Sequence, residues 1–125
     1  MTTDLATIPV LPTAWARLDE ALRARRPVLV SYHGLRRLVC PQALGWRAGR
    51  AMTLVCQTGG DTSTGRLNPD PTKRWRLLFV DQIDEVTDAP DAQWGTAHNY
   101  NPRHPFPVID EVSVAINFQP PPAQP

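Results

Sequence analysis

The sequence predicts a mainly β protein that begins with a single helix. Apolar residues recur at helical spacing near the N-terminus, and five short apolar or alternating runs follow, separated by glycine and proline. The chain has 125 residues, which suits one domain. One helix followed by five short strands is the element order of a small SH3-like or Sm-like barrel. We therefore expect such a five-stranded barrel, followed by a C-terminal extension.

The helix is expected over residues 13–25. Trp15, Leu18 and Leu22 recur at the spacing that brings side chains to one helix face. Pro27 ends the helix, because a proline removes a backbone donor and restricts the residue before it. The apolar face of this helix should pack on the barrel.

The five strands are defined by alternating or continuous apolar runs bounded by turn signals. We expect them at about residues 28–32, 36–47, 51–57, 75–80 and 83–87. Tight turns are expected at His33-Gly34 and at 47–50, and Pro41 should bend the second strand. Residues 58–72 are rich in glycine, proline and small polar residues and are expected to form a loop.

Three regions follow from this division: an N-terminal arm at 1–12, the barrel with its leading helix at 13–95, and an extension at 96–125. The alternation of Val108–Phe118 predicts one more strand, which pairs either with the barrel or with a second copy of the chain. A proline-rich tail follows it.

Composition favours a cytoplasmic protein. No run approaches the ~18 apolar residues of a membrane-spanning helix. The first residues lack the basic and apolar regions of a signal peptide. Cys40 and Cys56 lie in apolar strands and are expected to be reduced and buried, with a cross-strand redox pair as the alternative. The preference for arginine over lysine, with many alanines and prolines, suggests a GC-rich bacterial genome.

Charge is distributed unevenly along the chain. Residues 17–76 carry 12 basic and 4 acidic side chains, or +8, and residues 77–125 carry 1 and 7, or −6. With Asp4 the sum returns the net charge of +1. The basic stretch can form a surface for phosphates or other anions. Alternatively, the acidic C-terminal part folds back and neutralises it.

Several motifs resemble those of the WYL domain family, over about residues 15–95. The helical segment Leu18–Leu22 is followed by Val28–Tyr32, and Arg37–Val39 is followed by a proline and a leucine. Near the end, Arg76–Ile83 resembles the Arg-x-Phe-x-Leu-Asp-Arg-Ile pattern of the family. The resemblance implies a small β-barrel that serves as the ligand-sensing or nucleic-acid-sensing half of a bacterial transcription regulator.

The sequence departs from the family at three points. The Trp-Tyr-Leu signature falls on Met52, Thr53 and Leu54, so only the leucine is kept, and Gln82 stands where the family has an arginine. One helix ahead of the barrel is too little for a helix-turn-helix. A separate DNA-binding protein would therefore be the partner of a regulator of this kind.

The candidate binding residues are basic side chains of the strands and of the loop before residue 75, together with nearby aromatic residues. They are Tyr32, Arg36, Arg37, Trp46, Arg47, Lys73, Arg74 and Arg76. We expect the arginines to bind phosphates on an exposed surface, with Tyr32, Trp46 and Trp75 available to stack on bases. Alternatively, the arginines are solvated strand ends and the tryptophans belong to the core.

No catalytic or metal-binding motif stands out, so we expect a non-enzymatic protein without a cofactor. His98 and His104 are six residues apart, which matches no standard ligand spacing. Two functions stay open: a regulatory module that binds an anionic ligand or single-stranded nucleic acid, and a module that has lost the family pocket and works by docking on a partner or by homo-oligomerisation.

Overall fold

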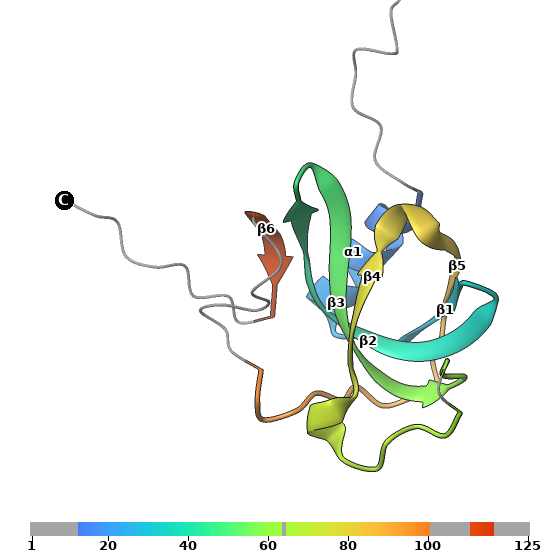
Figure 1. Ribbon diagram of the computed structural model, residues 1–125. Coiled ribbons are helices and arrows are strands. Elements are labelled where there is room, and N and C mark those ends of the chain that lie inside the picture. The colour runs from blue at the N-terminus through green and yellow to red at the C-terminus, as the bar shows by residue number, and fades with distance from the viewer. Residues whose placement is uncertain (1–12, 64, 101–110, 117–125) are drawn as a thin grey trace, which may run out of the picture.

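The computed structural model describes residues 13–63, 65–100 and 111–116, which form one antiparallel sheet and one α-helix (Figure 1). The elements, in chain order, are α1 (Thr13–Ala24), β1 (Val28–Tyr32), β2 (Leu35–Arg47), β3 (Arg50–Gly60), η2 (Pro71–Lys73), β4 (Trp75–Phe79), η3 (Val80–Gln82), β5 (Ile83–Asp88) and β6 (Glu111–Ala115). The elements labelled η are short 3-10 turns. The mainly β class with one N-terminal helix is confirmed.

The strands lie side by side in the order β4-β3-β2-β1-β5, and β6 pairs separately with β2. The sheet curls so that its two edge strands are joined by η3, but no ladder pairs β4 with β5 in the described part of the chain. The sheet is therefore open along one side rather than fully closed. The helix α1 packs against β2, β5 and η3.

Both predicted tight turns are present. His33 and Gly34 have φ of 50° and 77°, and Ala48 and Gly49 have φ of 50° and 78°. Two successive positive φ values are typical of the primed hairpin turns, whose twist matches that of the flanking strands. Ala48 adopts a conformation usually taken by glycine or asparagine, which the sequence did not indicate.

Strand β2 is long because it serves two pairings. Its register with β3 shifts between Pro41 and Ala43, as expected for a strand bent at a proline. Beyond this bend, β2 pairs with β6 on its other side. The predicted extra strand is thus confirmed over Glu111–Ala115, while residues 108–110 and 117–118 lie outside the described part.

Strand β3 is longer than predicted, so the loop expected from residue 58 begins only after residue 60. Gly59 and Gly60 pair with Leu38 and Arg37. Gly60 has a φ of 78°, and a Cβ there would lie 2.5 Å from the Arg36 carbonyl oxygen. The backbones of β2 and β3 approach so closely here that only glycine fits. With glycine at this position, the β2–β3 ladder continues to residue 60.

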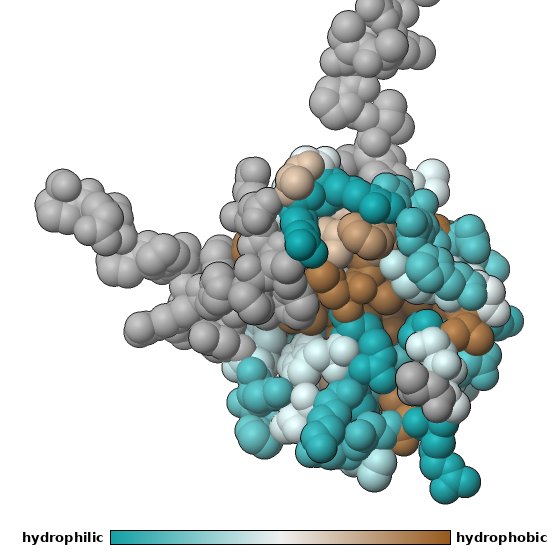
Figure 2. All heavy atoms as spheres, in the orientation of Figure 1, coloured by the Kyte–Doolittle hydropathy of each residue, from teal (hydrophilic) through white to brown (hydrophobic). Residues whose placement is uncertain are grey.

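The main core lies between α1 and the concave side of the curled sheet. Leu18 and Leu22 of α1 are buried against valine and leucine side chains of the strands. Trp15 stacks on Trp46, with ring centroids 5.0 Å apart. The predicted packing of the helix is confirmed. Figure 2 shows hydrophobic residues in the middle of the face seen in Figure 1, with hydrophilic residues around them.

The segment after β5 packs beside the middle strands of the sheet. The Gly95 amide donates to the Cys40 sulfur at 3.3 Å, and Ala97 is buried. The Tyr100 hydroxyl donates to the Ile116 carbonyl at 2.6 Å, which links this segment to the end of β6. Cys40 lies directly opposite Cys56, and both are buried free thiols, as expected. In the described residues, no helix is long and apolar enough to cross a membrane.

Candidate anion site

The candidate residues do not form one surface. Strand alternation sends Arg36 and Arg37 to opposite sides of β2. Arg36 is exposed, whereas Arg37 is only 6% exposed. The expectation that both arginines lie on an exposed surface is therefore wrong for Arg37, because adjacent residues of a strand cannot both face solvent when one side of the sheet is covered.

Arg37 shares the concave face of the sheet with the core. It lies two residues before Val39, whose partner on β3 is Gln57, while Val55 is the partner of Arg76 on β4. Directly paired residues point to the same face, as do residues two apart in one strand. Arg37, Gln57 and Arg76 therefore line the concave face on three adjacent strands.

The Nε atom of Arg37 is buried without an acceptor, and Arg37 forms no ion pair with any of the described residues. It lies 5.8 Å from the centre of the Tyr32 ring. Burial lowers the pKa of Arg37, and the neighbouring charge of Arg76 lowers it further. Tyr32 and Asp61 act in the opposite direction but more weakly, so the pKa stays lowered. Positive charge therefore predominates in the cluster of Arg37, Gln57 and Arg76.

Asp61 is the acidic side chain that acts on Arg37, but it forms no ion pair with it. One carboxylate oxygen instead accepts from the Arg36 backbone amide at 3.4 Å. Arg76 donates through Nη1 to the carbonyls of Lys73 and Trp75, at 3.2 and 2.9 Å. Neutral carbonyls leave the charge of Arg76 uncompensated in the part of the chain that the structure describes.

Tyr32 forms a wall of this cluster. Its ring is buried and stacks on His33 with centroids 4.0 Å apart. Its hydroxyl accepts from the Phe79 amide at 3.2 Å and lies 3.4 Å from Gln82 Oε1. This ring therefore bridges β1 and the end of β4 and is not free to stack on an extended strand of bases.

The other candidate residues lie apart from the cluster or serve the fold. Trp46 stacks on Trp15 at the main core. Arg47 is exposed at the β2–β3 turn. Arg74 donates to the carbonyls of Asn68 and Pro69 at 2.6 and 3.1 Å, so it holds the loop before β4, next to Lys73 in η2.

Trp75 is half-buried. It stacks on Tyr100 and donates to Asn99 at 2.8 Å. The only ion pair between the basic and acidic halves among the described residues is Arg50–Asp81, at 2.9 Å. Within the described residues, the acidic half therefore pairs with the basic stretch at this one point.

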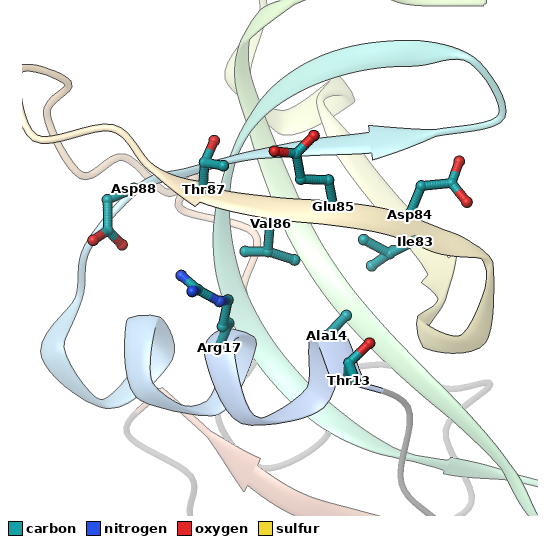
Figure 3. A pocket seen from close by; sticks show the side chains of 9 residues that line it. All are labelled: Thr13, Ala14, Arg17, Ile83, Asp84, Glu85, Val86, Thr87 and Asp88. Atoms are coloured by element: carbon teal, nitrogen blue, oxygen red, sulfur yellow. The ribbon is translucent and has the colours of Figure 1, made fainter.

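A groove of about 340 Å³ lies elsewhere, between α1 and the outer edge of β5 (Figure 3). Asp84, Glu85 and Asp88 of β5 are part of its lining, with Arg17 of α1. In Figure 3, Val86 points toward α1, whereas Glu85 points away from it. Three carboxylates against one guanidinium make this groove a poor place for an anion. The candidate anion site is therefore the pair Arg37 and Arg76 rather than this groove.

Sequence reasoning missed Gln57, which is completely buried on the concave face. A glutamine within the apolar run of β3 was the available signal, since a buried amide requires partners. No group of three or more His, Cys, Asp or Glu side chains that could hold a metal ion occurs among the described residues.

No protein-family model matches the chain, and searches of curated proteins and of solved structures each returned no match.

Proposed function

We propose that this chain is a regulatory binding module that holds the anionic group of a ligand between Arg37 and Arg76. The observation that carries the proposal is the buried Arg37, whose Nε has no acceptor, beside a second arginine on the same face. A buried charge costs several kcal/mol unless it is paired, so proteins rarely keep one without a use. An anion between the two guanidinium groups would supply the missing partner.

The position of the cluster favours a small ligand over a nucleic acid strand. A strand of nucleic acid needs a continuous exposed groove with aromatic platforms. Here Arg37 is buried, Tyr32 is part of a wall, and Trp46 packs on Trp15. A single anionic group, such as a phosphate or carboxylate, fits this arrangement better, because only one end of the ligand needs to reach the two arginines.

The resemblance to WYL domains supports a sensory, non-catalytic role. In such a role, ligand binding would be passed on to a DNA-binding protein. Tyr32, Arg37 and Arg76 are the residues that the resemblance and the geometry have in common.

A matched pair of variants tests the proposal. Arg37→Met removes the buried guanidinium, and Arg36→Met removes the exposed one beside it. We expect inorganic phosphate to raise the Tm of the wild type and of Arg36→Met but not that of Arg37→Met. If a labelled single-stranded oligonucleotide binds instead, and Arg36→Met weakens it while Arg37→Met does not, the exposed arginines are the functional ones.

One observation favours the alternative of partner docking or homo-oligomerisation. Strand β5 is an edge of the sheet, and the groove in Figure 3 runs along it. Free edges can add a strand from another chain. Concentration-dependent association in analytical ultracentrifugation, abolished by a proline in β5, would support this second function.

A further inference from the structure

The side chain of Gln57 is held in one orientation. Its Nε2 donates to the carbonyls of Gly59 and Asp61, at 2.9 and 2.7 Å. Turning the amide over would place its oxygen against these two carbonyl oxygens, so the hydrogen bonds assign the amide unambiguously. The oxygen Oε1 is buried and accepts no hydrogen bond from any described residue.

A second buried glutamine, away from the proposed site, allows a comparison of hydrogen-bond partners. Gln42 is also completely buried. Its Nε2 donates to the carbonyls of Cys40 and Gly95, and its Oε1 accepts from the Thr96 hydroxyl at 3.1 Å. The acceptor of Gln42 is thus satisfied within the protein, whereas that of Gln57 is not.

The unsatisfied groups of Gln57 and Arg37 are of opposite kinds, one an acceptor and the other a donor. Arg37 lies two residues before Val39, the partner of Gln57, on the same face of the sheet, and the β2–β3 register shifts between Leu38 and Val39. Long side chains at this spacing on one face can reach a common ligand. Arg37 Nε is a donor without an acceptor, and Gln57 Oε1 is an acceptor without a donor. An anion that has only acceptors would satisfy the first group and leave the second facing a negative charge.

We infer that Gln57 is a specificity-determining residue, whose Oε1 accepts a hydrogen bond from the ligand, so that the site prefers an oxyanion that carries its own hydroxyl. Hydrogen phosphate is the simplest such anion, and sulfate is its acceptor-only counterpart. A phosphodiester also lacks the donor, so the backbone of a nucleic acid is disfavoured at this site. The inference rests on the proposed function, because it concerns the same two-arginine cluster.

The test compares inorganic phosphate with sulfate, using isothermal titration of the full chain near neutral pH. Phosphate gains one hydrogen bond to Oε1, whereas sulfate leaves Oε1 unpaired. We therefore expect phosphate to bind about tenfold more tightly than sulfate. Dimethyl phosphate should bind no better than sulfate. Binding of sulfate as tight as that of phosphate would overturn the inference while leaving the proposed function intact, and absence of binding by both anions would overturn both.

Gln57→Lys provides the variant, because an ammonium group retains donors for the Gly59 and Asp61 carbonyls but has no acceptor. We expect it to bind both anions with the preference for phosphate lost, and a retained preference would contradict the role of Oε1. If this variant does not fold, the wild-type ratio and the dimethyl phosphate measurement decide the question.

Methyl phosphate distinguishes two possible ligands, the free phosphate anion and the phosphate end of an organic molecule. Its second proton is lost near a pH of about 6, so its binding should strengthen as the pH falls through this range if the site takes the end of an organic phosphate. Binding of inorganic phosphate alone would assign the site to the free anion.

Discussion

Replacing Arg37 by methionine should stabilise the anion-free protein, although it removes the central residue of the proposed site. Arg37 is buried without an ion pair, beside the like charge of Arg76. Replacing buried charges by apolar side chains of similar volume is neutral or stabilises by ~1–4 kcal/mol. The variant also loses the contact with the Tyr32 ring, worth roughly 0.5–1 kcal/mol.

The net expectation is a gain of about 1–2 kcal/mol in the free energy of unfolding, or roughly 3–10 °C in Tm for a domain of this size. The assay is thermal unfolding in a buffer without oxyanions. Arg36→Met is the control, since an exposed side chain should change stability by less than about 0.5 kcal/mol. Phosphate at ten times its Kd should then stabilise the wild type by about 1.4 kcal/mol and leave Arg37→Met unchanged.

A loss of stability in Arg37→Met would refute this reasoning. It would mean that the guanidinium is a structural element whose partners stabilise the fold, and the proposed site would lose its main support. A gain in stability with unchanged phosphate binding would place the anion elsewhere.

Three further results are expected. Burial raises the pKa of Tyr100 to about 12 from 10.0, so the folded state keeps a proton that the unfolded state releases, and stability should fall as the pH rises from about 10 to about 12. Thermal unfolding should show this fall, and Tyr100→Phe should lack it. Gly60→Ala should destabilise strongly, measured by urea unfolding, because its Cβ would meet the Arg36 carbonyl at 2.5 Å; unchanged stability would disprove the close approach. Burial raises the pKa values of Cys40 and Cys56, so both thiols should react slowly until the protein unfolds; one fast thiol would contradict their burial.

Much of the fold could be predicted because local signals agreed with the tertiary structure. The spacing of Leu18 and Leu22 marked the helix face that became buried, and Pro27 marked its end. Pro41 marked the bend of β2. Each signal acts within a few residues, so it could be recognised without knowing what packs against it.

The site could be predicted only in part, because its geometry depends on register between strands. Tyr32, Arg37 and Arg76 were identified as binding candidates from residue type, and pairing brings them to one face. Which of Arg36 and Arg37 is buried depends on the register, since a shift of one residue exchanges the two faces. Gln57 was missed because a glutamine shows its unsatisfied oxygen only once its neighbours are placed.

The most direct test of the anion site is nuclear magnetic resonance of the arginine side chains during titration with inorganic phosphate. The Nε–H group of Arg37 is buried and without an acceptor, so its signal should shift saturably as phosphate binds, with a smaller shift for Arg76. The exposed Arg36 should not respond in the same way. A silent Arg37 signal, or equal and unsaturable shifts across all exposed arginines, would contradict the account.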